Sequence, residues 1–218
     1  FNLYDNYSYY YLTHDGATGK RIEEKILPLS SDGAVEEFDE FKFFESDLEN
    51  VLISGREWYG DSYTYINPRN YSFSTPGLVS STDLTITSAL MGMIPGTSGY
   101  FNSKINGVSL GRQTIFGATS SNYGVKGQQN ISDFTLNSSS ISNPSNVNVE
   151  ITWDNSNNAS GIGYTNYLEI NYKRELSTSG SQLIFSSIGS LNNTNTEYEL
   201  SSSNSTMVVW DIENPVYP

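Results

Sequence analysis

The residue types that most often carry out catalysis are scarce in this chain. Its 218 residues include no cysteine and one histidine, His14, which lies in a His-Asp-Gly turn. A cysteine peptidase needs a thiolate and a nearby imidazole, and a serine triad would have to use His14. No Gly-x-Ser-x-Gly elbow accompanies this residue. We therefore expect the chain to have no enzymatic activity of this kind and His14 to be a solvated turn residue.

Paired carboxylates are a second kind of catalytic group. A glycosidase needs two acids at a fixed separation, one of which has a raised pKa. Glu150, Asp154 and Glu169 lie in or beside predicted strands, whose alternation could bring them near one another. Acids on the surface of a sandwich are usually solvated, so we expect no catalysis from them either.

Oxygen donors follow one of these acids. Asp154 and Asn155 open the run Asp-Asn-Ser-Asn-Asn, and a second acidic stretch covers residues 32–39. Calcium is bound by roughly six to eight such oxygens, often from loops. The spacing matches no EF-hand, so an ordinary asparagine-rich loop is the preferred interpretation. We predict no cofactor, with calcium at Asp154 and Asn155 as the alternative. One histidine and no thiol disfavour zinc.

The most distinctive stretch is Ser54-Gly55-Arg56-Glu57-Trp58-Tyr59-Gly60. Two glycines, which permit tight bends and close backbone approach, bracket a guanidinium, a carboxylate and two large aromatics. We interpret the run as a structural corner in which Arg56 pairs with Glu45 or Glu57 beneath the tryptophan. A contact with a ligand or partner is the alternative. The candidate site consists of Glu45, Arg56, Glu57, Trp58 and Tyr59.

Aromatic side chains continue beyond this run and suggest a second use. Stacking on sugar rings, as in a glycan-binding jelly roll, is open to Trp58, Tyr59, Tyr63 and Tyr65. On a strand, however, alternate members would face the core, where tryptophan and tyrosine are common. Trp153 and Trp210 lie in alternating strands and are predicted to be core residues. We favour packing for the group as a whole.

Strands must position all of these residues, because no convincing amphipathic helix longer than about three turns occurs. Val147 to Trp153 and Asp83 to Met91 alternate between apolar and polar residues. Asn106-Gly107 predicts a type I′ hairpin between two further strands. Other strands are expected around residues 35–49, 70–75, 134–136, 166–174, 182–186, 197–200 and 206–212. This pattern predicts an all-β fold: a two-sheet antiparallel β-sandwich, jelly-roll-like, with an N-terminal hairpin.

The expected domain organisation is simple. Residues 7–13 and 20–27 read as two strands joined by a turn. We therefore predict that residues 1–30 form an N-terminal hairpin segment linked to a preceding region. Residues 31–218 are predicted to form the sandwich. The chain opens at Phe1 and ends in an extended tail, so we expect both ends to be cuts through a longer polypeptide.

The charge balance restricts the partners. Eleven basic and 24 acidic residues give a formal net charge of −13. Nucleic acid is an unsuitable partner, because phosphate binding needs clustered lysine and arginine. No apolar run is long enough for a transmembrane helix. The abundance of asparagine, serine, threonine and aromatics is typical of a secreted or surface-exposed β protein.

Four stretches of the sequence, in a fixed order, span nearly the whole chain. They are Asn2-Leu3-Tyr4 with Tyr9-Tyr10-Tyr11-Leu12 and Gly19-Lys20-Arg21-Ile22; Glu45 to Asp61; Tyr167 to Leu176 with Gln182-Leu183-Ile184-Phe185; and Val209-Trp210-Asp211-Ile212 closed by Pro215. Together they resemble the β-rich region upstream of the catalytic domain in the PorU sortases of the type IX secretion system, which are gingipain-like cysteine peptidases. Glu169 and Glu213-Asn214 depart from the family pattern, but neither the glycines nor the tryptophans are affected.

The resemblance implies a role that the residues alone do not. In that family the whole enzyme removes C-terminal sorting signals from secreted cargo at the cell surface, beside the outer-membrane barrel protein PorV. This chain would then be an accessory domain that scaffolds a downstream peptidase domain, on the extracellular face of the outer membrane of a Gram-negative bacterium. PorV and cargo are the implied partners. The alternative function is a glycan-binding jelly-roll module of a cell-surface protein.

Overall fold

The computed structural model describes residues 30–53, 55–119, 121, 123–202 and 206–213, together with residues 7, 9–12, 14, 16, 18–19, 22 and 24–27. The described part consists of strands and loops, with two short 3₁₀ helices, η1 (Ser138–Ser140) and η2 (Ile188–Asn192). The expected all-β class is confirmed.

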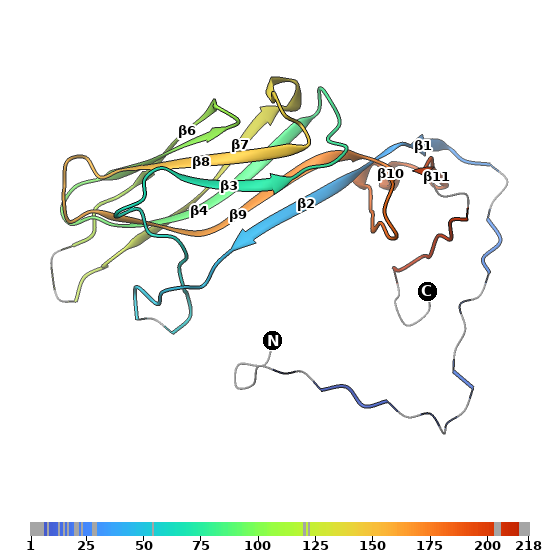
Figure 1. The fold of residues 1–218 in the computed structure, drawn as a ribbon, viewed down its shortest axis with the longest axis horizontal. Helices are drawn as coiled ribbons and strands as arrows, with labels where there is room; N and C mark the ends of the chain where they lie inside the picture. Colours follow the sequence, from blue (N-terminus) through green and yellow to red (C-terminus); the bar gives the residue numbers. More distant parts are fainter. Residues whose placement is uncertain are drawn as a thin grey trace. The chain divides into compact units, whose positions relative to one another are not determined.

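Eight strands form two four-stranded antiparallel sheets that pack face to face (Figure 1). We call the sheet with the order β2-β9-β4-β7 the first sheet and the one with the order β3-β8-β5-β6 the second sheet. The strands of the first are β2 (Glu37–Glu45), β9 (Ile162–Glu175), β4 (Asp83–Met93) and β7 (Gln128–Asn137). Those of the second are β3 (Arg69–Ser74), β8 (Asn146–Asp154), β5 (Gly99–Ile105) and β6 (Val108–Ile115).

The connections have the jelly-roll pattern. Successive strands pass from one sheet to the other, except β5 and β6, which form a hairpin within the second sheet. The last long strand, β9, returns to lie beside the first, β2, and β8 returns beside β3. The predicted antiparallel, jelly-roll-like sandwich is therefore confirmed.

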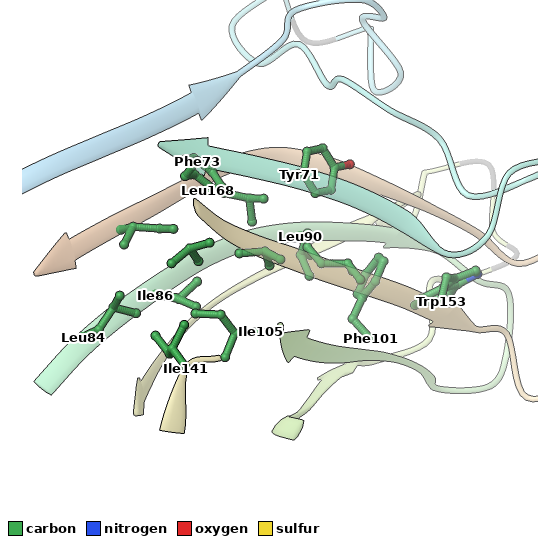
Figure 2. Close-up of a cluster of buried hydrophobic side chains, with 14 of the residues drawn as sticks. Tyr71, Phe73, Leu84, Ile86, Leu90, Phe101, Ile105, Ile141, Trp153 and Leu168 are labelled. Carbon is green, nitrogen blue, oxygen red and sulfur yellow. The ribbon is translucent and has the colours of Figure 1, made fainter. Parts of the chain in front are cut away.

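The core lies between the two sheets and follows from strand alternation (Figure 2). Val147, Val149 and Ile151 are fully buried, while the polar residues between them face outward. Burial of each such side chain contributes about 1.5–3 kcal/mol. Trp153 is buried at the end of the same strand, 4.5 Å from the ring of Phe101 between centroids. The sequence pattern had predicted this inward row correctly.

The predicted hairpin turn is also present. Asn106 and Gly107 join β5 to β6, and both have positive φ angles, 45° and 86°. A type I′ turn requires this conformation at both central positions, and asparagine followed by glycine adopts it at low cost.

A bulge in β9 changes which residues face the core. Ala89 of β4 pairs with Tyr167, but the next residue, Leu90, pairs with Thr165, so Asn166 is an extra residue. The alternation shifts by one position there. Thr165 and Leu168 consequently both point between the sheets, whereas Tyr164 packs against Met91 in a separate small cluster.

Two short parallel strand pairs are separate from the two four-stranded sheets. β1 (Gly33–Val35) pairs with β11 (Thr196–Tyr198), and β10 (Ser177–Thr178) pairs with β12 (Ser201–Ser202). The strand expected over residues 182–186 is wrong, since these residues are irregular. Phe185 instead packs its ring on Phe38 and Tyr198, with centroid distances of 6.2 and 5.4 Å.

Residues 30–203 form one compact unit, and residues 1–29 and 204–218 contribute to another. Within the second unit, Lys25 Nζ lies 2.9 Å from Asp211 Oδ2. The described residues of the expected N-terminal hairpin, and residues 206–213, carry no strand, and the remaining residues of both stretches lie outside the described part. The prediction that Trp210 is a core residue is wrong, because 59% of it is exposed. Strand-forming residues need a partner strand to complete their hydrogen bonds, and the described segment offers none.

Candidate functional site

The distinctive run belongs to a loop that leaves and rejoins the first sheet. β2 ends at Glu45, and after residues 46–58 the chain returns to pair with β9. Gly60 N–H donates to the carbonyl of Thr165 (2.8 Å), and Tyr63 N–H donates to that of Gly163 (2.9 Å). A Cβ atom at Gly60 would lie 2.6 Å from the Ser46 carbonyl oxygen. Glycine is therefore required where the two ends of the loop meet.

Tyr59 anchors this loop. Its side chain is fully buried against Met91 and Tyr164. The hydroxyl donates to Glu57 Oε2 at 2.9 Å. Burial, followed by this carboxylate, raises the pKa of the Tyr59 hydroxyl well above its usual value, so the tyrosine remains a neutral donor. This contact fastens the run at Tyr59, and the interpretation of the run as a structural corner stays a prediction.

The other members of the predicted cluster lie at the surface. Arg56 and Glu45 are exposed, and Trp58 is 45% exposed. The ion pair of Arg56 with Glu45 or Glu57 stays a prediction. Glu45 lies opposite Tyr167 in the pairing of β2 with β9, on the outer face of the first sheet. The structure thus brings Glu57 and Tyr59 together and leaves Trp58 available at the surface.

The aromatics considered for sugar stacking divide in the same way. Tyr65 is almost fully exposed, at 98%, whereas Tyr63 is buried. The Tyr63 and Tyr71 hydroxyls each lie 2.8 Å from Thr165 Oγ1 and 3.3 Å from each other. Burial raises the pKa of both tyrosines, which keeps the hydroxyls protonated. This network links β3 of the second sheet to β9 of the first, so its role is packing.

The carboxylates considered for catalysis lie on opposite sides of the sandwich. Glu150 and Asp154 point outward from the second sheet, where Lys104 lies 2.8 Å from Glu150 and Arg112 lies 3.6 Å from Asp154. Glu169 points outward from β9 of the first sheet, between the buried residues Leu168 and Ile170. The core separates these acids, so the approach of Glu169 to the other two that the sequence allowed is wrong.

The loop considered for calcium is closed by hydrogen bonds of its own. Asp154 Oδ1 accepts from the backbone N–H of Ser156 at 2.8 Å, and its other oxygen faces Arg112. Asn158 donates its amide to the Pro95 carbonyl at 2.9 Å. Among the described residues, no group of three or more histidine, cysteine, aspartate or glutamate side chains lies close enough together to hold a metal ion. The prediction of no cofactor, with calcium at Asp154 and Asn155 as the alternative, stays a prediction.

The outer face of the first sheet carries a feature that sequence reasoning missed. Phe41 and Phe43 of β2 and Tyr167 of β9 form a continuous stack, which we call the aromatic row. The centroids of Phe41 and Phe43 are 6.1 Å apart with planes 25° apart, and those of Phe43 and Tyr167 are 5.8 Å apart with planes 30° apart. Phe41 and Phe43 are 49% and 46% exposed. The alternation of these two phenylalanines was the available signal.

Carboxylates surround the aromatic row. Partial burial, and then the negative charges of Glu169, Asp133 and Glu45, raise the pKa of the Tyr167 hydroxyl. Glu169 and Asp133 project from β9 and β7 on the same face, and Glu45 ends β2. The face therefore combines exposed apolar rings with negative charge.

Two ion pairs fasten β2 to β9. Arg174 lies 2.7 Å from Glu40 on the core side of the sheet, and Lys173 lies 2.7 Å from Asp39 on the outer side. Although burial acts to raise them, the pKa values of the Glu40 and Asp39 carboxyls are lowered, because these cations and backbone N–H groups donate hydrogen bonds to them.

Among the described residues, no helix has the length and apolar character needed to cross a membrane.

Comparison with known proteins identifies a structural relationship at the level of the fold. No protein-family model and no curated protein matches the chain. Dimeric latent PorU from Porphyromonas gingivalis is similar in structure, with a TM-score of 0.60 and 17% sequence identity. The similarity covers 78% of this chain and 16% of the PorU chain. The chain therefore spans a small part of the length of the structure that it resembles.

Two carbohydrate-binding modules show weaker similarity. The CBM36-1 domain of a multidomain xylanase from the hindgut metagenome of Trinervitermes trinervoides has a TM-score of 0.38 and 13% identity, over 66% of this chain and 99% of its own. CBM35 from Cellvibrio japonicus Abf62 has a TM-score of 0.33 and 16% identity, over 64% and 95%. TM-scores this low do not support a conclusion about function.

Proposed function

We propose that this chain is a non-catalytic accessory β-sandwich of a PorU-like type IX secretion sortase. The observation that carries the proposal is the similarity of this sandwich to part of PorU over 78% of the chain. Two of the four stretches that resemble the family also meet in space. Glu45, which opens the stretch that ends at Asp61, pairs with Tyr167, which opens the next stretch.

The proposed role is to scaffold the cysteine peptidase downstream and to present a surface to partners. A sandwich that has a continuous core and an interior network of tyrosine and threonine hydroxyls is a rigid support. The absence of cysteine supports a division of labour in which the thiolate belongs to another domain. PorV and secreted cargo are the proposed partners, at the outer-membrane surface.

The first experiment is to sequence the gene on both sides of this chain. The proposal requires a downstream domain that contains a cysteine and a histidine in a peptidase arrangement. A gene that encodes no such domain would remove the sortase assignment. This result does not depend on the folding of any variant.

The second experiment tests the role of the sandwich in the whole protein. Full-length protein that carries Arg56→Ala or Trp58→Ala is expressed in cells that lack the endogenous copy, and cargo maturation is followed by immunoblot. If this surface contacts a partner, we expect slower removal of the sorting signal in both variants. The matched control is Phe116→Ala, at an exposed aromatic of another loop. Normal processing in both variants would remove these two residues from the proposed contact surface.

Glycan binding is the second candidate, favoured by the exposure of Trp58 and Tyr65. Both side chains have area free for stacking on a sugar ring. Titration of intrinsic tryptophan fluorescence with bacterial surface polysaccharides separates the two candidates. A saturable change that Trp58→Ala abolishes supports glycan binding, and a flat response to all polysaccharides argues against it.

A further inference from the structure

Within the part of the chain that the structure describes, the outer edge of β2 is open along part of its length. Asp39 N–H donates to the Ser186 carbonyl (3.1 Å), away from β9, while the Lys173 carbonyl opposite it accepts from Val79 N–H (2.9 Å). Asp39 and Lys173 are therefore a pair without mutual backbone hydrogen bonds. The pairing of β2 with β9 runs without a register shift, so Phe41, Phe43 and Glu45 have the same orientation.

These residues direct their backbone groups away from the sheet. Phe41 N–H is bonded to the Glu40 side chain at 3.1 Å. Within the described part of the chain, no backbone hydrogen bond outside the sheet covers Phe43 or Glu45. β2 is also the terminal strand of its sheet (Figure 1). An edge of this kind is a template for one more strand.

Side chains beside this edge define what can dock there. The aromatic row supplies exposed apolar area next to the open backbone groups. Phe43 stacks on Phe41 at one face and on Tyr167 at the other. Both faces of the central ring are therefore occupied, which leaves ring edges toward solvent. Phe43 is therefore unsuited to stacking on a sugar, but its exposed ring edge can pack against apolar side chains.

The negative charge around the aromatic row favours a ligand with positive charge. Glu45, Glu169 and Asp133 lie close enough to act on the Tyr167 hydroxyl. The whole chain carries a formal charge of −13, so a second copy at this edge would meet like charge. A positively charged occupant gains attraction that a second copy does not.

From the open edge, the aromatic row and the surrounding carboxylates, we infer that β2 binds an extended, lysine- or arginine-rich peptide segment as an added strand along residues 41–45. The peptide backbone pairs with the outward groups of Phe43 and Glu45. Its apolar side chains pack on the ring edges, and its basic side chains meet Glu45 and Glu169. Addition of a strand to a sheet edge is a general mode of peptide recognition. The site rests on residues of the sandwich itself and does not require the proposed sortase parentage.

The ligand sequence is unknown, so the probe is a phage-displayed library of random dodecapeptides. The library is panned on the 218-residue chain after depletion on the variant Phe41→Thr/Phe43→Thr, because threonine keeps strand propensity while removing the rings. We expect enriched peptides to combine several basic residues with alternating apolar ones. Failure to enrich any peptide, or enrichment of neutral or acidic peptides, would overturn the inference.

The affinity of an enriched, fluorescein-labelled peptide is then measured by anisotropy in low and high salt. We expect Phe41→Thr/Phe43→Thr and Glu45→Gln/Glu169→Gln each to weaken binding about tenfold or more, equivalent to about 1.4 kcal/mol. The second variant should also reduce the salt dependence. Phe116→Thr, at an exposed aromatic outside the row, should bind as the wild type does.

Main-chain pairing is tested separately. Phe43→Pro removes the ring and, from the backbone, only an outward donor, so the sheet should tolerate it. Phe43→Thr removes the ring alone, so comparison of the two variants isolates the lost hydrogen bond. Two peptides carry N-methyl groups on alternate residues, one on the odd and the other on the even positions. The peptide whose methyl groups block the backbone donors that face β2 should bind weakly. Equal binding by Phe43→Pro and Phe43→Thr, and by both methylated peptides, would exclude an added strand. Concentration-dependent dimers that Phe43→Pro abolishes would assign the edge to a second copy and overturn the inference.

Discussion

The two outer faces of the sandwich differ although the strands behind them are built alike. On the second sheet the outward residues are polar and the charges are matched: Lys104 pairs with Glu150, and Arg112 pairs with Asp154 while lying 3.9 Å from the Tyr100 ring centroid. On the first sheet the outward residues include the aromatic row and its surrounding carboxylates. Outward positions contribute little to the core, so they are free to differ. A contiguous exposed group of apolar side chains, unlike a single one, is typical of an interaction surface.

Neighbouring residues of β9 provide the largest expected contrast. Leu168 is fully buried, and its neighbour Tyr167 lies on the outer face. Leu168→Ala should lower the free energy of unfolding by about 2–5 kcal/mol, because it leaves a cavity between the sheets. Tyr167→Thr should lower it by much less. Urea denaturation measures both, and similar losses would show that the aromatic row belongs to the fold rather than to a binding surface.

The hydroxyl network shared by both sheets should give the next largest effect. Thr165→Val keeps the shape but removes the oxygen that lies within 2.8 Å of both Tyr63 and Tyr71. The unfolding free energy should fall by about 1–3 kcal/mol, the cost of unsatisfied buried hydroxyls. Thr165→Ser is the matched control and should recover part of the loss. If valine is as stable as threonine in thermal and urea melts, the network has no stabilising role.

The ion pairs of β2 predict how stability depends on pH. The carboxyls of Asp39 and Glu40 have lowered pKa values in the folded protein. Their stabilisation is therefore present above the unfolded values, 3.8 and 4.5, and is lost as the pH falls through the lower folded values. Glu40→Gln should cost about 1 kcal/mol at neutral pH and flatten the acid limb of the stability curve. Glu150→Gln on the other face is the comparison, and an unchanged acid limb in Glu40→Gln would contradict the assignment.

The smallest effect on stability should come from the two outer faces themselves. Phe43→Thr on the first sheet and Tyr100→Thr on the second are each expected to change the unfolding free energy by no more than about 0.5 kcal/mol. Their binding behaviour should differ, however, because only Phe43 adjoins the open edge of β2. Loss of peptide binding in Tyr100→Thr as well would show that the two faces are not functionally distinct.

The local sequence was sufficient to predict features that depend on neighbouring residues alone. Asn106-Gly107 predicts its own turn because few other pairs tolerate two positive φ angles. Val147 to Ile151 alternate, and alternation on a strand that separates core from solvent leaves little choice of orientation. The resemblance to PorU sortases was likewise visible in the sequence, and the structure supports it at the level of the fold.

The candidate site was less predictable, since it depends on contacts between distant segments. Trp58 and Tyr59 are neighbours in the sequence, but Tyr59 is buried because Tyr164 and Met91 cover it, and Trp58 is not. The aromatic row joins Phe43 to Tyr167 only because β9 returns beside β2.

The sequence by itself determined that this chain forms strands, where one tight turn lies, and that no cysteine is available as a nucleophile. The tertiary structure decided which sheet each strand joins and therefore which side chains share a face. The bulge at Asn166 shows why: one extra residue shifts the alternation and places Thr165 in the core. Apolar alternation predicts which side of a regular strand is the inside, but beyond a bulge only the packing of the two sheets fixes which residues lie inside.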